Sequence, residues 1–190
     1  MNDSTAMQKR LPGDLAIWIF ILAELTVFAA LFVSFSVSKS MNIEMFAEGQ
    51  ATLHPMMGLI NTLSLITSSY FVAKAVFFAA QGQLAKSSQW IWMGIAIASI
   101  YIVTKFMEYQ SLMALGYNMR TNIFYTLYFF ITFFHFMHVL MGIVILVYVA
   151  QKAKKGGYED DITGIETGAS YWHMVDMVWV ILFPLIYVIQ

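Results

Sequence analysis

Two histidines lie three residues apart in the apolar segment "FFHFMHVLMG", and a histidine and an aspartate lie three apart in "YWHMVDMVWV". A spacing of three places both members of a pair on one face of a helix. Imidazole is a common ligand of haem and copper, and it exchanges protons near neutral pH. The pairs His135–His138 and His173–Asp176 therefore suggest a metal or haem site, proton transfer, or hydrogen bonds between helices.

Three further ionisable side chains interrupt apolar segments. Glu24 lies about ten residues into the first segment, and every residue three or four positions away from it is apolar. It must therefore be neutral or face a partner on another helix, with proton handling as the functional alternative. Lys105 and Glu108 are again three residues apart, which favours a structural ion pair, and we expect it near the outer membrane surface.

The composition identifies the class of protein. Of 190 residues, 60% are hydrophobic and 11% are charged, whereas a soluble domain carries about 25% charged residues. We therefore expect an integral membrane protein. The net charge of -1 gives no basic surface for nucleic acid, and the absence of cysteine excludes disulfides, iron–sulfur clusters and thiolate-bound metals.

Polar stretches divide the chain into five apolar segments, each long enough to cross a bilayer as a helix. We expect an all-α bundle of five transmembrane helices in one domain, 1–190. The first segment is too long for a removable signal peptide, and we expect it to stay as an anchor. The predicted spans are about 15–38, 57–80, 89–112, 122–150 and 168–189.

The basic residues predict the orientation of the bundle. Seven of the ten Lys and Arg residues fall on one side of the membrane, which the positive-inside rule assigns to the cytoplasm. The N-terminus is then cytoplasmic and, after five crossings, the C-terminus is outside. The seven are Lys9, Arg10, Lys74, Lys86, Lys152, Lys154 and Lys155.

Other residues predict how the helices pack. The second segment is rich in Asn, Ser and Thr, and Gly94 and Ala98 in the third are both small, which favours close approach of neighbouring helices. Tyr171 and Trp172 fit an aromatic belt at the membrane surface. Pro184 is expected to kink the last helix.

Together these segments resemble subunit III of the haem-copper oxidase superfamily. "YWHMVDMVWVILFPLIY" is similar to the last helix of that subunit, and Glu166 matches a glutamate just ahead of it. The segment with His135 and His138 resembles the penultimate helix. Lys105 stands at the first position of a Gln-x-x-Glu-Tyr element, where the family usually has Gln. "HPMMGLINTLSLITSS" resembles the His-Pro segment, and Glu24 matches a buried carboxylate known in the family for its carbodiimide reactivity.

The resemblance extends over all five spans but lacks the two N-terminal helices of seven-span subunits. It is closest to the short five-helix branch found with quinol oxidases and nitric oxide reductases, and the opening "LPGDLAIWIFILAEL" looks most like NorE-type accessory proteins of nitric oxide reductase. This implies a multi-pass protein of the bacterial inner membrane. Its expected role is a non-catalytic accessory subunit that supports the assembly, stability and proton uptake of a haem-bearing catalytic subunit.

The resemblance also implies that the chain holds no haem or metal of its own, and that membrane lipids, including bound phospholipid, are among its partners. Its buried polar residues would then form a network that joins the helices. That network would comprise Glu24, Lys105, Glu108, His135, His138, Glu166, His173 and Asp176.

Two alternatives remain. One is a membrane b-type cytochrome that binds haem through His135 or His138 together with His173. The other is a small proton-coupled transporter that uses Glu24 and the histidine pair. The absence of an internal repeat and of paired Gly- or Pro-broken helices argues against the transporter.

Overall fold

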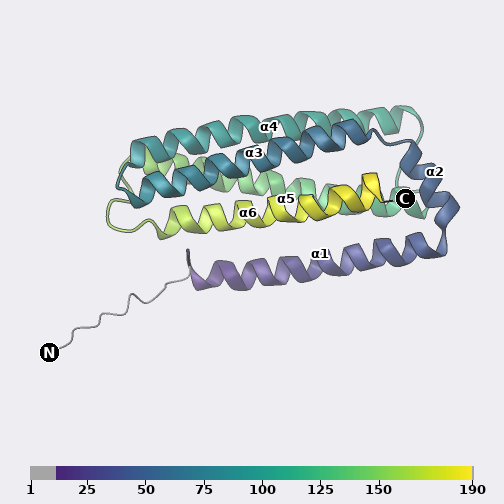
Figure 1. The fold of residues 1–190 in the computed structure, drawn as a ribbon, viewed down its shortest axis with the longest axis horizontal. Helices are drawn as coiled ribbons and strands as arrows, with labels where there is room; N and C mark the ends of the chain where they lie inside the picture. The colour runs from purple at the N-terminus through teal and green to yellow at the C-terminus, as the bar shows by residue number, and fades with distance from the viewer. Residues whose placement is uncertain (1–11, 190) are drawn as a thin grey trace.

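The computed structural model describes residues 12–189, in which the regular structure is entirely helical (Figure 1). Five helices are long and apolar enough to cross a membrane, which confirms the predicted all-α class and the number of spans. Their ends lie within about five residues of the predicted ones. The five are α1 (Leu15–Met41), α3 (Pro55–Ala80), α4 (Leu84–Ala114), α5 (Ile123–Lys154) and α6 (Thr163–Phe183). The orientation in the membrane stays a prediction.

Helices α3 to α6 form the core of the bundle, and the most extensive contact in it joins α3 to α4. Small residues make this contact possible, as the sequence predicts. Ser68 of α3 donates a hydrogen bond of 2.8 Å to the carbonyl of Gly94 on α4. A Cβ atom at Gly94 would lie only 3.3 Å from the Ser68 carbonyl oxygen, so the glycine sets how closely the two backbones approach.

Helix α1 packs on one side of this core, mainly against α6 and α5 (Figure 1). Its buried side chains are Ile21, Phe28 and Phe35, which recur every seven residues along one narrow line. Much of the rest of its surface is exposed and apolar, as expected for a helix that faces lipid. Helix α1 is therefore the least enclosed of the five.

The connection between the first two spans contains a helix that the sequence analysis did not predict, α2 (Ile43–Ala51). Its Phe46 packs in edge-to-face geometry on Phe35 of α1 and Phe124 of α5, with ring centroids 5.2 and 5.4 Å apart. A Cβ at Gly49 would lie 2.2 Å from the Phe124 ring, so only glycine fits there. Gln50 donates a hydrogen bond of 2.7 Å to the carbonyl oxygen of Ile186, and this bond attaches α2 to the end of the chain.

The last helix differs from expectation at both ends. The α-helix stops at Phe183, and Pro184 begins a π-helical turn, η1 (Pro184–Val188), so the predicted kink takes this form. Tyr171 and Trp172 were expected at the membrane surface, but both are buried in the bundle. The reason is that both rings lie on the face of α6 that packs on α5, where they meet Gly142 and Tyr171 donates to the carbonyl of His138.

Candidate functional site

The ion pair on α4 is completely enclosed. Lys105 Nζ donates to Glu108 Oε2 at 2.9 Å, and the two side chains are 0% and 1% exposed. The ammonium also donates to the hydroxyls of Tyr128 on α5, at 3.1 Å, and Tyr187 of η1, at 2.8 Å. Tyr187 in turn lies 2.9 Å from both carboxylate oxygens. The predicted pair is confirmed and is enclosed within the bundle, while its depth in the membrane stays a prediction.

This cluster uses every proton of the ammonium group, because three donors meet three acceptors. Rings of Tyr109 and Trp179 lie within 5.5 Å of the same nitrogen and add favourable cation–π contacts. A buried charge without partners would cost several kcal/mol, and here each charge is met by the other and by hydrogen bonds. The cluster therefore joins α4, α5 and η1 and leaves no group free to react.

A second pair links α1 to α5. His138 Nε2 lies 3.1 Å from Glu24 Oε2, and His138 Nδ1 lies 2.8 Å from the carbonyl oxygen of Phe134. The side chain of Glu24 is 20% exposed, so this pair is less enclosed than the first. Glu24 thus has the interhelical partner that the sequence required, and His138 forms one of the predicted bonds between helices.

The hydrogen bonds of His138 restrict where its protons can be. A carbonyl can only accept, so Nδ1 must carry a proton and donate it to Phe134. The contact with Glu24 then needs one further proton, held either by the carboxyl group or by Nε2. The Glu24–His138 pair therefore shares one exchangeable proton, either as a neutral acid and base or as an ion pair.

His135 differs from its neighbour on the same helix. Its ring is 0% exposed and lies edge-on to Tyr101, at 5.7 Å, and 5.2 Å from Trp179. Within residues 12–189, neither of its ring nitrogens has a hydrogen-bond partner, and neither does the Tyr101 hydroxyl. The predicted interhelical hydrogen bond is therefore wrong for His135, because aromatic rings rather than polar groups surround it.

His173 on α6 contacts α3. Its Nδ1 forms a 2.6 Å hydrogen bond with Ser69 Oγ. The side chains of His173 and Asp176 are both only half-buried. Among the described residues, Asp176 Oδ1 has no hydrogen-bond partner. His173 thus attaches α6 to α3 through Ser69 rather than through a bond to Asp176.

The hydrogen bonds of the histidines bear on which nitrogens are open to a ligand. His138 uses both ring nitrogens, and His173 Nδ1 bonds Ser69. In the part of the chain that the structure describes, no group of three His, Asp or Glu side chains could hold a metal ion. The expectation that the chain holds no haem of its own stays a prediction.

Glu166 fixes the beginning of α1. Its Oε2 accepts a 2.9 Å hydrogen bond from the Gly13 amide, and Thr167 Oγ1 accepts one of 3.2 Å from the Asp14 amide. Gly13 has a φ of +80°, and a Cβ there would lie 3.1 Å from Thr167 Cα. Glu166 lies in the first turn of α6 rather than ahead of it. The sequence analysis missed Gly13 and Thr167, although a glycine just before the helix-capping Asp14 is a signal for such a turn.

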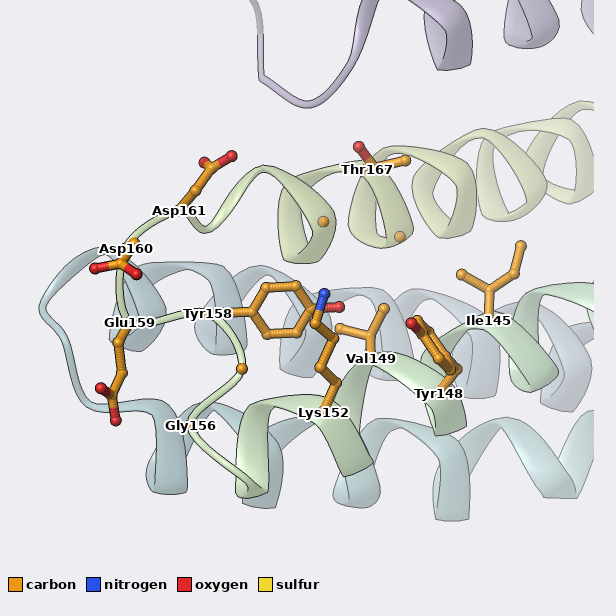
Figure 2. A pocket seen from close by; sticks show the side chains of 13 residues that line it. Ile145, Tyr148, Val149, Lys152, Gly156, Tyr158, Glu159, Asp160, Asp161 and Thr167 are labelled. Atoms are coloured by element: carbon orange, nitrogen blue, oxygen red, sulfur yellow. The ribbon is translucent and has the colours of Figure 1, made fainter.

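A cavity of about 610 Å³ lies at the same end of the bundle, where the α5–α6 loop meets both helices (Figure 2). Tyr158 fills the space between them, and Lys152 Nζ lies 4.6 Å from the centre of its ring. Burial raises the pKa of Tyr158, which keeps the hydroxyl protonated. Glu159, Asp160 and Asp161 also line the cavity, and Asp161 Oδ1 accepts a 2.9 Å hydrogen bond from the Thr163 amide.

Comparison with known proteins gives consistent matches over nearly the whole chain. Residues 3–190 match the family model for cytochrome c oxidase subunit III. The chain is 29% identical over 177 residues to cytochrome c oxidase subunit 3 of Thermostichus vulcanus, which covers 92% of this chain and 86% of the relative. It is 31% identical over 175 residues to the corresponding subunit of Corynebacterium diphtheriae, with 90% and 85% covered. A probable quinol oxidase subunit 3 of Staphylococcus saprophyticus is 25% identical over 185 residues, with 93% and 89% covered.

Proposed function

This chain belongs to the cytochrome c oxidase subunit III family, and on that premise we propose that it is a non-catalytic accessory subunit of a haem-copper oxidase-type respiratory complex. Its partner would be a haem-bearing catalytic subunit in the bacterial inner membrane. The chain itself would carry no redox centre, and phospholipid would be bound to it. Its role would be to stabilise the catalytic subunit, to assist its assembly and to help supply it with protons.

One observation supports this proposal above the others. Glu24 of α1 and His173 of α6 form hydrogen bonds to neighbouring helices, yet both, like Asp176, are only partly buried. An ionisable group at membrane depth costs roughly 2.5–3.5 kcal/mol when it faces lipid. Partly exposed Glu24, His173 and Asp176 would be better satisfied beside a second protein. The bundle surface around them is therefore suited to being covered by a partner.

The Glu24–His138 pair is the candidate for proton supply. It holds one exchangeable proton and lies at the least enclosed helix of the bundle. The Lys105–Glu108 pair, by contrast, has every group satisfied and no exposed surface. Within the complex, Glu24 is thus better placed than Glu108 to exchange a proton with water or with the catalytic subunit.

Two partners in the superfamily are possible. The relatives named as oxidase subunits support a terminal oxidase. The resemblance of "LPGDLAIWIFILAEL" to NorE-type proteins supports a nitric oxide reductase as the second candidate. In the structure, Gly13 of this opening segment donates the hydrogen bond to Glu166 that fixes the start of α1. The resemblance to NorE-type proteins therefore includes a residue with a structural role.

Affinity purification tests the proposal. The chain is tagged at its N-terminus, expressed in its own host and extracted in mild detergent, and the co-purifying proteins are identified by mass spectrometry. We expect a haem-bearing catalytic subunit, whose identity decides between oxidase and nitric oxide reductase. Recovery of the folded chain alone, with haem bound to it, would overturn the proposal.

A matched pair of variants sharpens this test. Asp176→Leu removes a half-buried carboxyl group from the surface that we propose is covered, and should lower recovery of the catalytic subunit. Glu159→Gln changes an exposed residue of the α5–α6 loop and should leave recovery unchanged. Equal recovery with both variants would mean that the α6 surface is not part of the interface.

A further inference from the structure

The chain enters α1 beside the cavity of the α5–α6 loop. The Gly13 amide donates a hydrogen bond of 2.9 Å to Glu166 Oε2, and the Asp14 amide donates one of 3.2 Å to Thr167 Oγ1. Thr167 is itself one of the residues that line the cavity. The residues just ahead of α1 are therefore attached to the beginning of α6, and the chain that precedes them starts from the edge of this cavity.

The loop beside this point is acidic. Three consecutive carboxylates, Glu159, Asp160 and Asp161, line both the cavity of about 610 Å³ and a second one of about 450 Å³ that shares Tyr158 with it (Figure 2). All three are exposed. Among the described residues that line these cavities, the basic one is Lys152, whose ammonium group lies 4.6 Å from the centre of the Tyr158 ring. Negative charge therefore exceeds positive charge around the two cavities.

The sequence that leads to this point is basic. Lys9 and Arg10 are consecutive and precede the described part of the chain. Arg10 is three residues ahead of Gly13, so the two Cα atoms are at most about 11 Å apart. The point of attachment lies about 6 Å along α6 from the beginning of that helix, and Asp161 is two residues before it. Both basic side chains can therefore reach Asp160 and Asp161 without any movement of the described residues.

We propose that Lys9 and Arg10 dock on the acidic α5–α6 loop and form ion pairs with Asp160 and Asp161. The segment ahead of α1 would then cross the beginning of α6 and cover the edge of the cavity. Exposed ion pairs are individually weak, but the hydrogen bonds at the start of α1 already hold this segment beside its acceptors, which raises their effective concentration. The contact would give α1, the least enclosed helix, a further attachment. The inference is independent of the proposed accessory function.

Zero-length cross-linking of the purified full chain in a neutral detergent tests the contact. A water-soluble carbodiimide joins a lysine amine to a carboxylate only where the two groups meet, and mass spectrometry of the peptides locates the new amide bond. We expect Lys9 to be joined to Asp160 or Asp161. Raising the salt concentration from about 0.1 M to about 1 M should lower the yield severalfold, because the Debye length falls from about 10 Å to about 3 Å. No cross-link from Lys9 to either aspartate would overturn the proposal.

Matched variants of the loop show whether these two carboxylates are the acceptors. Asparagine at position 161 can still accept the hydrogen bond from the Thr163 amide, so Asp161→Asn keeps the cap of α6. The double variant Asp160→Asn and Asp161→Asn should nearly abolish cross-linking of Lys9. Glu159→Gln removes the neighbouring exposed carboxylate and should leave the yield unchanged. The proposal is overturned if the double variant unfolds at the same temperature as the unmodified chain and Lys9 still reacts in full yield with another carboxylate.

The same reaction in vesicles separates the loop from the membrane surface as the partner of Lys9 and Arg10. An anionic surface attracts basic residues next to a span and competes with the loop for them. We expect the cross-link of Lys9 both in vesicles of phosphatidylcholine and in vesicles that also contain phosphatidylglycerol. Its loss in the vesicles with phosphatidylglycerol would overturn the proposal, because the lipid surface would then hold the two basic side chains in a membrane.

Discussion

The two ionisable pairs of this bundle, Lys105–Glu108 and Glu24–His138, both place polar groups among apolar helices, but they differ in how completely they are enclosed. Lys105 and Glu108 are on one helix, one turn apart, and are enclosed completely by residues of α5 and η1. Glu24 and His138 are on different helices, and Glu24 is 20% exposed. In the first pair, all donors of the ammonium group are satisfied. In the second, one proton is shared between two groups that can each hold it.

This difference indicates which pair is structural and which is suited to exchange. Breaking a fully buried pair leaves an uncompensated charge in the core, so the enclosed pair should matter most for stability. A partly exposed pair gains less from its contact, because solvent or a neighbouring molecule can replace it. The enclosed pair therefore stabilises the core, whereas the open pair can take part in a function that needs access.

The largest expected effect comes from removing one member of the enclosed pair. Lys105→Met leaves the Glu108 carboxylate without its main partner and should lower the free energy of unfolding by about 3–5 kcal/mol. Adding Glu108→Gln should recover a large part of the loss, because the unpaired charge is then removed. Reversible unfolding in mixed detergent measures both. A loss below about 1 kcal/mol would show that the pair does not stabilise the core.

A smaller effect is expected at the open pair. Glu24→Leu removes the hydrogen bond to His138 and should cost about 1–2 kcal/mol, since the contact is charged or strongly polar but partly exposed. Glu24→Gln keeps a hydrogen-bonding group and should cost less. A double-mutant cycle with His138→Leu in the same unfolding assay isolates the coupling. A coupling as large as that of the enclosed pair would contradict the distinction between the two.

The smallest effect is expected where α1 begins. Glu166→Ala removes the acceptor of the Gly13 amide and should cost about 0.5–1.5 kcal/mol, confined to the first turns of α1. Hydrogen–deuterium exchange should rise in a peptide that covers residues 12–20 and stay constant in peptides of α4. Thr163→Ala, in the same first turn of α6, is the control for disturbance of that helix. Unchanged exchange after Glu166→Ala would mean that other contacts hold α1 in place.

The sequence predicts where the helices of this fold lie better than it predicts which residues pack against each of them. Apolar length alone locates five spans, and a spacing of three correctly pairs Lys105 with Glu108. Spacing cannot say what a helix face meets, however. His135 and His138 are three residues apart, yet one is enclosed by rings and the other bonds Glu24. That difference depends on how α1, α4 and α6 pack around α5, which no local pattern contains.

Other features of the fold cannot be predicted from the sequence for a similar reason. Helix α2 is only nine residues long and lies in a connection, so hydropathy gives no signal for it. Its position depends on the contact between Gly49 and Phe124, far apart in the chain. A groove of about 890 Å³, lined by residues of α4 and α5 such as Tyr109 and Phe133, likewise forms only when these two helices come together. The resemblance to a family singled out eight polar residues, but the structure was needed to show that they form separate contacts, some enclosed and some open.

Carbodiimide labelling tests the central distinction most directly. The purified chain is treated with the membrane-soluble reagent dicyclohexylcarbodiimide, which modifies accessible carboxyl groups within the bilayer, and modified residues are located by mass spectrometry. We expect Glu24 to be modified and Glu108 to remain unmodified in the folded chain, because only Glu24 has exposed side-chain surface that the reagent can reach. Modification of Glu108 as fast as Glu24 would contradict the account, since the enclosed pair would then be open as well.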